Sequence, residues 1–542
     1  DLFLMAASQP FSVALQGGLD KASNALELLK TPGKATTLTN FEVSTKGGYR
    51  RINGYSQFGN GTRPNSSNDI LGLKVYADGV VACSGTNIYF SQTGNSWLQI
   101  NKASVSGSGD NHTAFTGRSA STRTSQSKTH FATFEGDTEY GELIITDEGS
   151  GAKPFYFKMT GTDSDITNRT FFAKEITVSG THYPKFCVIH DKHLVVAGAA
   201  TAKNTIFYSG TSDIDDFTSS GSGSIVLDDQ VVGLKSFRDE LFIFCRNSIY
   251  KLQNINNAST IAIVPVTKNV GCVDGKTIQE FAGDLIFLAP DGFRTVAGTA
   301  RIGDVELGTI SKSIQPILNS IFDSTIVQEY SSVVIRDKSQ YRMYYSSSTA
   351  STASSKGIIG TLTSRGFEWS EIEGIQAPAV TSGFNASDIE KAFHGDRDGY
   401  VYNHDTGNSF NPAGSETNIH ARYQSPDFDY GDFGTLKTLD HVKVSLFPEG
   451  TIEPQLKVRF DYDSADRPQP ENLTINAQAP SIFGDSGTVF GTSIFGAPEQ
   501  PLVRNTLIGS GHSNFFNIFS NDVKAPYTIN GLYINYRPSG RQ

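Results

Sequence analysis

The chain has 542 residues, enough for two or three domains with cores of their own, and its 37% hydrophobic content excludes a disordered protein. The 53 glycines, 21 tyrosines and 36 phenylalanines, beside only 3 methionines, indicate an all-β protein, because glycine forms turns and aromatic residues favour strands. A formal net charge of −10 argues against a general nucleic-acid-binding surface, because binding to phosphates needs clustered Lys and Arg. It does not exclude a channel through which DNA passes without being bound.

The first 60 residues form a distinct entry segment. Residues 23–30 predict one short helix, ended by a proline and a glycine at positions 32 and 33. Residues 35–45 then alternate as a strand, a two-glycine turn follows, and residues 49–58 return. We therefore expect a helix and a hairpin in residues 1–60.

A strand–turn–strand unit recurs after this segment. Residues 72–92 and 233–253 align without gaps and both begin Gly-Leu-Lys. Their further shared positions are Asp78 and Asp239, Ile88 and Ile249, Tyr89 and Tyr250, and Gln92 and Gln253. A fainter copy lies 44 positions on, where Phe281 matches Phe237. A period in the 40s with several short strands per unit is typical of propeller blades.

Each unit contains one strand rich in aromatic residues, which we expect to be the inner strand of its blade. Seven candidates lie near Ile88, Phe155, Ile206, Ile249, Phe293, Tyr344 and Tyr400. Six or eight units remain open, because the second and sixth carry long polar insertions at 107–127 and 346–355, expected to be surface loops. The prediction for residues 61–415 is a β-propeller of six to eight blades.

One amphipathic helix is predicted within the propeller region. Residues 313–322 place apolar side chains at helical spacing, and Pro316 is tolerated there if Ser313 caps the helix, which puts the proline in the first turn.

The texture changes from about residue 417. Alternating segments are joined by long connections, including a stretch rich in Gly, Phe and Pro at 481–501. The expected strands lie at 422–430, 442–447, 455–462, 514–519 and 527–536. Such spacing predicts a separate C-terminal β-sandwich over residues 416–542.

The cysteines and the apolar segments limit the environment of the chain. Cys83, Cys187, Cys245 and Cys272 lack metal-ligand spacing, so we expect reduced, buried thiols, with disulfides as the alternative. No stretch approaches the ~20 apolar residues of a membrane span. Residues 1–7 lack the basic region of a secretory signal, and we expect folding in a cytoplasm.

Two groups of side chains invite a metal interpretation. His190 and His193 stand three apart, but they span a turn between two strands, so we expect the rings to diverge. Asp213, Asp215 and Asp216 crowd another turn, where a calcium loop is conceivable. The EF-hand pattern is absent, and solvated turn carboxylates are the expected interpretation.

Two further patterns bear on glycan chemistry. Residues 91–97 are similar to the Asp-box of sialidase-like propellers, but Thr93 occupies the acidic position. Glu368, Glu371 and Glu373 interleave with apolar residues, as in a strand with one solvated face; a saccharide platform is the alternative. No G-x-S-x-G, phosphate-binding loop or H-E-x-x-H occurs. We predict no catalytic, cofactor-binding or metal-binding residues, no cofactor, and no enzymatic activity.

Several runs resemble a known class of proteins. The most distinctive is Gly47-Gly48-Tyr49-Arg50-Arg51-Ile52, and the others lie at 16–20, 38–42, 233–252, 271–275 and 301–307. Together they resemble tail-associated virion proteins of bacteriophages. The nearest group is the tail hub or nozzle proteins of short-tailed phages, including packaged-DNA stabilisation proteins, and cyanophage structural proteins share the texture.

The resemblance implies a propeller-bearing structural subunit of a hub, nozzle or neck ring, assembled in the virion after synthesis in the host cytoplasm. Its implied partners are other tail or portal-adaptor proteins and further copies in a homo-oligomeric ring. DNA enters only by passage through a channel, and no membrane is involved. Residues 47–55 then either close the propeller or dock on a neighbour through Arg50 and Arg51.

Two other functions remain open. The alternative is a host-surface propeller that binds or cleaves glycans, which predicts aromatic residues and paired carboxylates at one mouth. A third is a scaffold propeller of cellular origin that recruits peptides across its top face.

Overall fold

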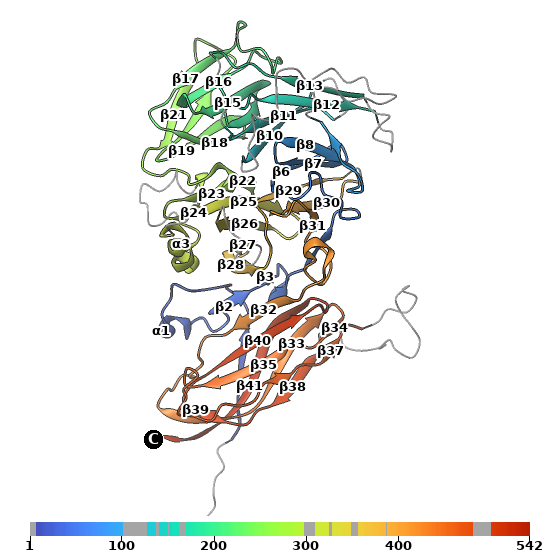
Figure 1. Cartoon of the computed structure of the whole chain (residues 1–542). Coiled ribbons are helices and arrows are strands. Elements are labelled where there is room, and N and C mark those ends of the chain that lie inside the picture. The colour runs from blue at the N-terminus through green and yellow to red at the C-terminus, as the bar shows by residue number, and fades with distance from the viewer. Residues whose placement is uncertain are drawn as a thin grey trace, which may run out of the picture.

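The structure is a computed structural model that describes residues 7–100, 127–136, 140–149, 151–161, 170–180, 182–297, 309–324, 328–347, 356–385, 387–480 and 500–541. The expected loops at 107–127 and 346–355 and the Gly/Phe/Pro-rich stretch at 481–501 fall almost wholly outside these ranges. Nearly all the regular elements of the described residues are strands, which confirms the all-β prediction. Figure 1 shows the propeller strands in the upper part and a second, two-layered region in the lower part.

Seven antiparallel sheets follow one another along the described part of residues 55–404 and surround a common centre. The first three blades, in chain order, are β6 (Ile70–Tyr76), β7 (Gly79–Ser84), β8 (Asn87–Ser91) and β9 (Leu98–Gln99); β10 (Thr129–Phe134), β11 (Glu142–Asp147), β12 (Phe155–Thr160) and β13 (Thr170–Glu175); and β14 (Phe186–His190), β15 (His193–Ala199), β16 (Ala202–Tyr208) and β17 (Gly223–Val226). The fourth and fifth blades are β18 (Val231–Phe237), β19 (Glu240–Cys245), β20 (Ile249–Gln253) and β21 (Ala262–Thr267); and β22 (Gln279–Phe281), β23 (Asp284–Ala289) and β24 (Gly292–Thr295). The sixth and seventh blades are β25 (Gln328–Ile335), β26 (Gln340–Ser347), β27 (Lys356–Thr363) and β28 (Gly366–Glu373); and β29 (Ala379–Phe384), β30 (Glu390–Gly395), β31 (Val401–His404) and β5 (Tyr55–Gln57). This arrangement is a β-propeller, and its seven sheets fall within the predicted six to eight.

The innermost strand of each blade differs from the prediction. The first strands, β6, β10, β14, β18, β22, β25 and β29, line the centre, whereas most of the aromatic-rich strands are third in their blades and Tyr344 lies in a second strand. The reason is crowding at the axis. A Cβ on Gly72 would lie 2.7 Å from Cβ of Thr129 in the next blade, so bulky side chains pack further out. Between the first two blades, for example, Phe90 packs with Leu143 and Phe157.

Strand β5 completes the seventh blade, although it precedes the first blade in the chain. It pairs antiparallel with β31, with Ser56 opposite Asn403, and the amide of Phe58 donates to the carbonyl of Val401 at 2.9 Å. The ring is therefore closed by hydrogen bonds between its two ends. Closure by the entry segment was one of the expected roles, and β5, at the end of the predicted returning strand 49–58, provides it, while β3 and β4 enter the lower region.

The lower region has two large sheets that share one buried core, beside a two-stranded sheet of β34 (Thr451–Ile452) and β37 (Ala477–Gln478). The first contains β1 (Gln9–Ala14), β3 (Phe41–Val43), β4 (Tyr49–Arg51), β33 (Thr435–Pro448), β38 (Leu502–Thr506), β39 (Ser510–Gly511) and β41 (Tyr527–Arg541). The second contains β2 (Thr37–Thr39), β32 (Ile419–Gln424), β35 (Gln455–Phe460), β36 (Leu473–Thr474) and β40 (Asn514–Asp522). Val444 and Leu532 of the first sheet belong to the same core as Val458 and Ile518 of the second.

This second sheet continues into the propeller. Strand β2 pairs with β32 on one side and parallel to β28 on the other, where Thr39 lies opposite Glu371. The sixth blade and the lower layer thus form one nine-stranded sheet. The entry segment is divided between both sheets and the last blade, so residues 416–542 complete their layers only with β1–β4. A separate C-terminal sandwich therefore stays a prediction.

Two α-helices accompany the strands in these ranges. Helix α1 (Ala25–Leu28) lies within the predicted residues and begins with a capping box between Asn24 and Glu27. Helix α3 (Gln315–Phe322) carries Pro316 in its first turn as predicted, but the Ser313 cap is wrong, because this serine lies inside a preceding 3₁₀ turn. No helix among the described residues is long and apolar enough to cross a membrane.

Candidate functional site

A cavity of about 460 Å³ lies at the centre of the propeller. Residues of all seven first strands or the turns leading into them line it. Its volume falls within the range of about 300–1,000 Å³ that is usual for small-ligand pockets.

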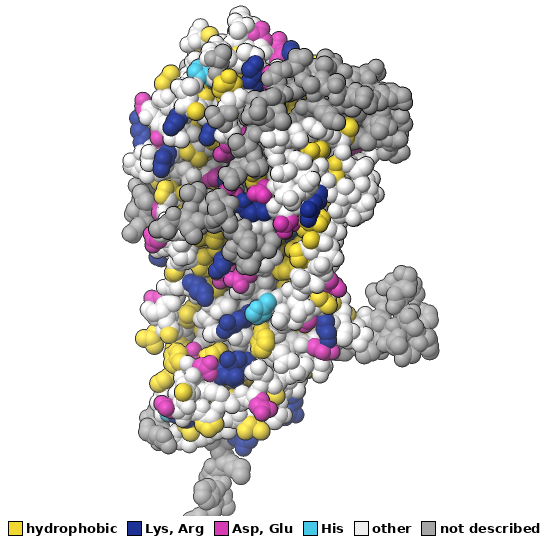
Figure 2. All heavy atoms as spheres, in the orientation of Figure 1, with side chains coloured by type: hydrophobic (Ala, Val, Ile, Leu, Met, Phe, Trp, Pro, Cys, Tyr) yellow, Lys and Arg dark blue, Asp and Glu magenta, His cyan; other side chains and the backbone are white. Residues whose placement is uncertain are grey.

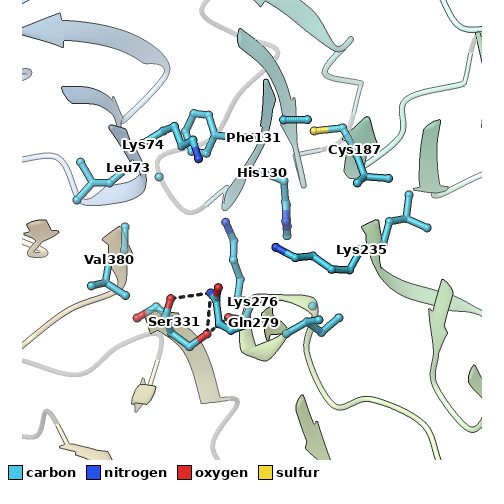
Figure 3. Close-up of a pocket in the computed structure, with 18 of the residues that line it drawn as sticks. Leu73, Lys74, His130, Phe131, Cys187, Lys235, Lys276, Gln279, Ser331 and Val380 are labelled. Atoms are coloured by element: carbon cyan, nitrogen blue, oxygen red, sulfur yellow. Dashed lines mark hydrogen bonds between the residues drawn. The ribbon is translucent and has the colours of Figure 1, made fainter. Parts of the chain in front are cut away.

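Three lysines dominate the chemistry of this central cavity. Figure 3 shows the side chains of Lys74, Lys235 and Lys276 reaching toward its middle from three different blades. Lys74 and Lys235 are the lysines of the repeated Gly-Leu-Lys unit, on β6 and β18. Neither makes a hydrogen bond or ion pair with any described residue, whereas Lys276 Nζ donates to the carbonyl of Thr129.

Burial lowers the pKa of all three ammonium groups. Burial lowers the pKa of Lys74, and the nearby charges of Lys235 and Arg336 lower it further. Burial likewise lowers the pKa of Lys235, against an opposing effect of Glu280. The pKa of Lys276 is lowered by burial more than Glu148 raises it. The cavity is therefore a place where positive charge is crowded and poorly hydrated.

Contacts between the second and fifth blades cross one end of the cavity. Lys128 Nζ, just before β10, lies 3.1 Å from Oδ2 of Asp274, just before β22. Beside them, Nε2 of His130 and Oε1 of Glu148 are 2.8 Å apart. The Lys128–Asp274 pair and the Lys276–Thr129 hydrogen bond tie the second and fifth blades together across the axis of the ring.

A larger cavity of about 630 Å³ adjoins this end and contains both carboxylates. Glycoside hydrolysis needs one carboxylic acid that is protonated near neutral pH. Burial raises the pKa of Glu148, but His130 and Lys128 outweigh it and lower the pKa to about 2. Glu148 is therefore ionised at neutral pH and is unsuited to act as that acid.

A buried ionic cluster joins the entry segment to the sixth and seventh blades. Oxygens of Glu42 on β3 lie 2.8 Å from Arg50, 3.0 Å from Lys338 and 2.9 Å from Arg342. Asp405 approaches Lys338 at 2.7 Å and Arg342 at 3.3 Å. Burial alone would raise the pKa of Glu42, but Lys338, Arg342 and Arg50 outweigh it, so the pKa lies below its ordinary value.

The two hairpin arginines pair within the chain. Arg50 also contacts Glu449 at 2.5 Å, and Arg51 contacts Asp522 at 2.8 Å. Both carboxylates belong to the lower region of the same chain, so the two arginines hold the hairpin against that region. The expected contact with carboxylates is present, but its described partners are intramolecular.

The structure places the two candidate metal groups apart from the central lysines. His190 and His193 face each other across a turn but bond different partners: Nδ1 of His190 lies 2.9 Å from Ser236 Oγ, and Nδ1 of His193 lies 2.6 Å from the carbonyl of Ser209. Asp215 pairs with Lys174, and a hydrogen bond with Asp215 raises the pKa of Asp213, while Asp216 accepts from Thr218. Among the described residues no group of three His, Cys, Asp or Glu could hold a metal.

The residues of the two candidate glycan patterns make packing contacts and hydrogen bonds within the described structure. Glu368 is buried rather than solvated, contrary to the prediction, because its Oε2 accepts the amide of Gly17 at 2.7 Å. Trp369 is 1% exposed and stacks on Phe293. In the Asp-box-like run, the Oγ of Ser91 accepts the amide of Gly94, which forms the local turn.

The sequence patterns described above do not predict a site at the three central lysines. The repeat itself held the signal for Lys74 and Lys235, since equivalent positions in equivalent strands point the same way relative to the axis. Lys276 lies outside the repeat and offered none. The four cysteines are all buried and free, which confirms the thiol prediction.

Comparisons with known proteins give little beyond the fold. No family model matches, and no curated protein matches. Among solved structures, the exo-β-1,3-galactanase of Phanerochaete chrysosporium with galactose is 8% identical, with 90% of this chain and 100% of that chain covered and a TM-score of 0.27. The extracellular domain of the one-component system BT4673 of B. thetaiotaomicron is 8% identical over 69% of this chain and 45% of that chain, with a TM-score of 0.36. The AfRom2 CNH domain is 11% identical over 64% and 100%, also at 0.36. At such TM-scores these likenesses carry no argument about activity.

Proposed function

We propose that the chain is a structural subunit of a bacteriophage tail, in a hub, nozzle or neck ring, that acts through protein–protein contacts. The observation that carries the proposal is the continuous joining of its parts. One nine-stranded sheet runs from the sixth blade into the lower region, and the Glu42 cluster ties the hairpin to two blades. A body without a hydrogen-bonding break between its regions suits a subunit under mechanical load. The sequence resemblance to tail proteins is the second support.

Under this proposal the DNA conduit lies between subunits rather than through a propeller. The central cavity holds only about 460 Å³, and the Lys128–Asp274 pair crosses one end of it. Such a space suits a small ligand and not a duplex. A ring of copies would form the passage, and the other tail or portal-adaptor proteins would extend it.

The lower region supplies the surface for assembly. Figure 2 shows hydrophobic side chains among the charged ones over this part of the molecule. Of the ten large hydrophobic side chains exposed among the described residues, six lie in residues 416–542, which are less than a quarter of the chain: Phe433, Tyr462, Leu502, Ile508, Val523 and Tyr533. Exposed aromatic and aliphatic side chains are typical of interaction surfaces.

The test is the mass of the purified chain by light scattering across a concentration series. We expect a discrete ring mass, and Ile508→Asp, which places charge on a side chain that is 84% exposed, should lower it. Val226→Asp is the matched control, because Val226 is similarly exposed but lies on an outer propeller strand. A monomer at every concentration, alone and with purified tail partners, would contradict the proposal.

The second candidate is a propeller that binds glycans of the host surface. The 630 Å³ cavity favours it, because Gln230, Arg246, Lys203 and Phe186 offer hydrogen-bonding and aromatic groups at one end of the ring. Binding is favoured over cleavage, since Glu148 is ionised. The test is a glycan array with the purified chain, followed by calorimetry of any sugar that binds. Absence of binding on the array would discard this candidate.

A further inference from the structure

The central cavity is lined by a one-sided set of charges. It contains Lys74, Lys235 and Lys276, and none of the described residues that line it is acidic. This occurs inside a protein whose formal net charge is −10. Two carboxylates at one end are engaged, Asp274 with Lys128 and Glu148 with His130, and Glu280, outside the lining, favours the charged form of Lys235.

The unengaged donors in the cavity are ammonium groups. Lys74 and Lys235 bond no described residue, although they project from blades one and four into the same space. Lysine is seldom placed in such a half-buried position without a partner, because its charge loses hydration. The charge of Lys235 also lowers the pKa of Lys74 through repulsion.

Three neutral polar side chains of the wall already make hydrogen bonds within the protein. Gln279 Nε2 donates to the carbonyl of Ser332 at 3.0 Å and lies 3.1 Å from its hydroxyl, which itself donates to the carbonyl of Lys276 at 2.6 Å. Ser331 donates to the carbonyl of Ala377. Gln279, Ser331 and Ser332 are thus engaged, whereas an anion would meet Lys74 and Lys235, which bond no described residue.

We propose that the central cavity binds one small tetrahedral oxyanion, phosphate or sulfate, between Lys74, Lys235 and Lys276. Lysine binds such anions as a point charge, and three ammonium groups can surround a dianion. The anion would neutralise the repulsion and hold the first, fourth and fifth blades together at the axis. This inference is independent of the tail assignment, since it concerns one chain alone.

The test uses the full chain, dialysed free of phosphate and sulfate. Thermal unfolding is followed while sodium phosphate or sodium sulfate is added, with sodium chloride at equal ionic strength as reference. We expect a saturable rise in Tm with either oxyanion and none with chloride. Glycerol phosphate forms a further arm: an equal rise indicates that an esterified phosphate is accepted, and no rise that the site takes only the free ion.

Variants assign the effect to the cavity. Lys74→Gln and Lys235→Gln, singly and together, should keep or raise the Tm without anion, because repulsion is relieved, and should reduce or abolish the oxyanion-dependent rise. Lys391→Gln is the control, since this exposed lysine lies on β30 away from the cavity. Line broadening of the ³¹P signal of phosphate by the wild-type chain provides a measurement that depends on no variant.

Two results would overturn the proposal. One is a wild-type Tm and a ³¹P linewidth that respond to phosphate no more than to matched ionic strength. The other is a Lys74→Gln/Lys235→Gln chain that keeps the full oxyanion-dependent rise, which would place the binding elsewhere.

Discussion

Removal of the charge of Glu42 tests whether the buried cluster joins the regions of the protein. The side chain of Glu42 is 3% exposed and contacts three cations, Arg50, Lys338 and Arg342. With Asp405 and Glu449 the cluster has three positive and three negative groups. Glu42→Gln keeps the shape and leaves one uncompensated positive charge in a buried site.

The cost follows from general experience with buried pairs. Loss of one partner costs about 3–5 kcal/mol when the other stays buried. Asp405 still lies 2.7 Å from Lys338, so we expect the lower end, about 3 kcal/mol, or roughly a hundredfold in the unfolding equilibrium. Arg342→Met in the Glu42→Gln background should cost less than the sum of the two single changes, because charge balance returns.

The assay is urea denaturation followed by the fluorescence of Trp369 in a Trp97→Phe background, where Trp369 is the single tryptophan. Trp369 reports on the junction, because its carbonyl accepts the amide of Leu19 at 2.8 Å. The control is Glu373→Gln: Glu373 is 51% exposed, lies 3.6 Å from Lys356, and should contribute less than about 0.5 kcal/mol. If Glu42→Gln costs no more than this control, the remaining carboxylates balance the cations and the reasoning fails.

Three further outcomes are expected. In the same urea assay, Gly18→Ala should lower the free energy of unfolding by about 2–4 kcal/mol and Gly47→Ala by about 1 kcal/mol. Both glycines have positive φ, but only at Gly18 would a Cβ lie 2.8 Å from the backbone nitrogen of Trp369. Equal losses for the two variants would contradict this reasoning. Burial lowers the pKa of His404 to about 3, so the unfolded state binds the extra proton below about pH 6.5 and stability should fall as pH drops from about 6.5 to about 3, by about 1.4 kcal/mol per unit. Denaturation at several pH values should show a flatter dependence for His404→Gln, and an unchanged slope would count against the assignment. Burial raises the pKa of Cys187 to about 11, and all four thiols should resist DTNB in the native chain and react after denaturation; rapid reaction of the native chain would show the burial to be wrong.

The repeat unit could be predicted from the sequence because its strands are neighbours along the chain. The strands of its two copies, β6–β8 and β18–β20, lie where the alignment of residues 72–92 and 233–253 indicates. The hairpins between the first two strands were harder to recognise. Ala77–Asp78 and Arg238–Asp239 have positive φ at both positions, as in a type I′ turn, without the Asn-Gly or Asp-Gly that usually marks it.

The course of the entry segment could not be inferred from sequence. The expected strand over 35–45 is interrupted at Asn40, whose φ is 54°, so β2 and β3 enter different sheets. The partners that decide this, Glu371 for Thr39 and Asn403 for Ser56, lie more than 300 positions away. Alternation of apolar and polar side chains predicts that a segment is a strand, but it does not predict with which distant strand the segment pairs. The central lysines share this limit, since only closure of the ring brings Lys74 and Lys235 together.

The placement of the earliest strands has a consequence for biosynthesis. Strands β1 and β4 pair with β41, and β5 pairs with β31, so these early strands wait for partners synthesised more than 340 residues later. At about 5–20 residues per second, translation of 542 residues takes roughly half a minute or more. During that time the edges of the nascent strands are unpaired and open to other chains. The propeller cannot close before β31 is made, nor the lower region before β41, so chains that stop earlier would not become competent for assembly.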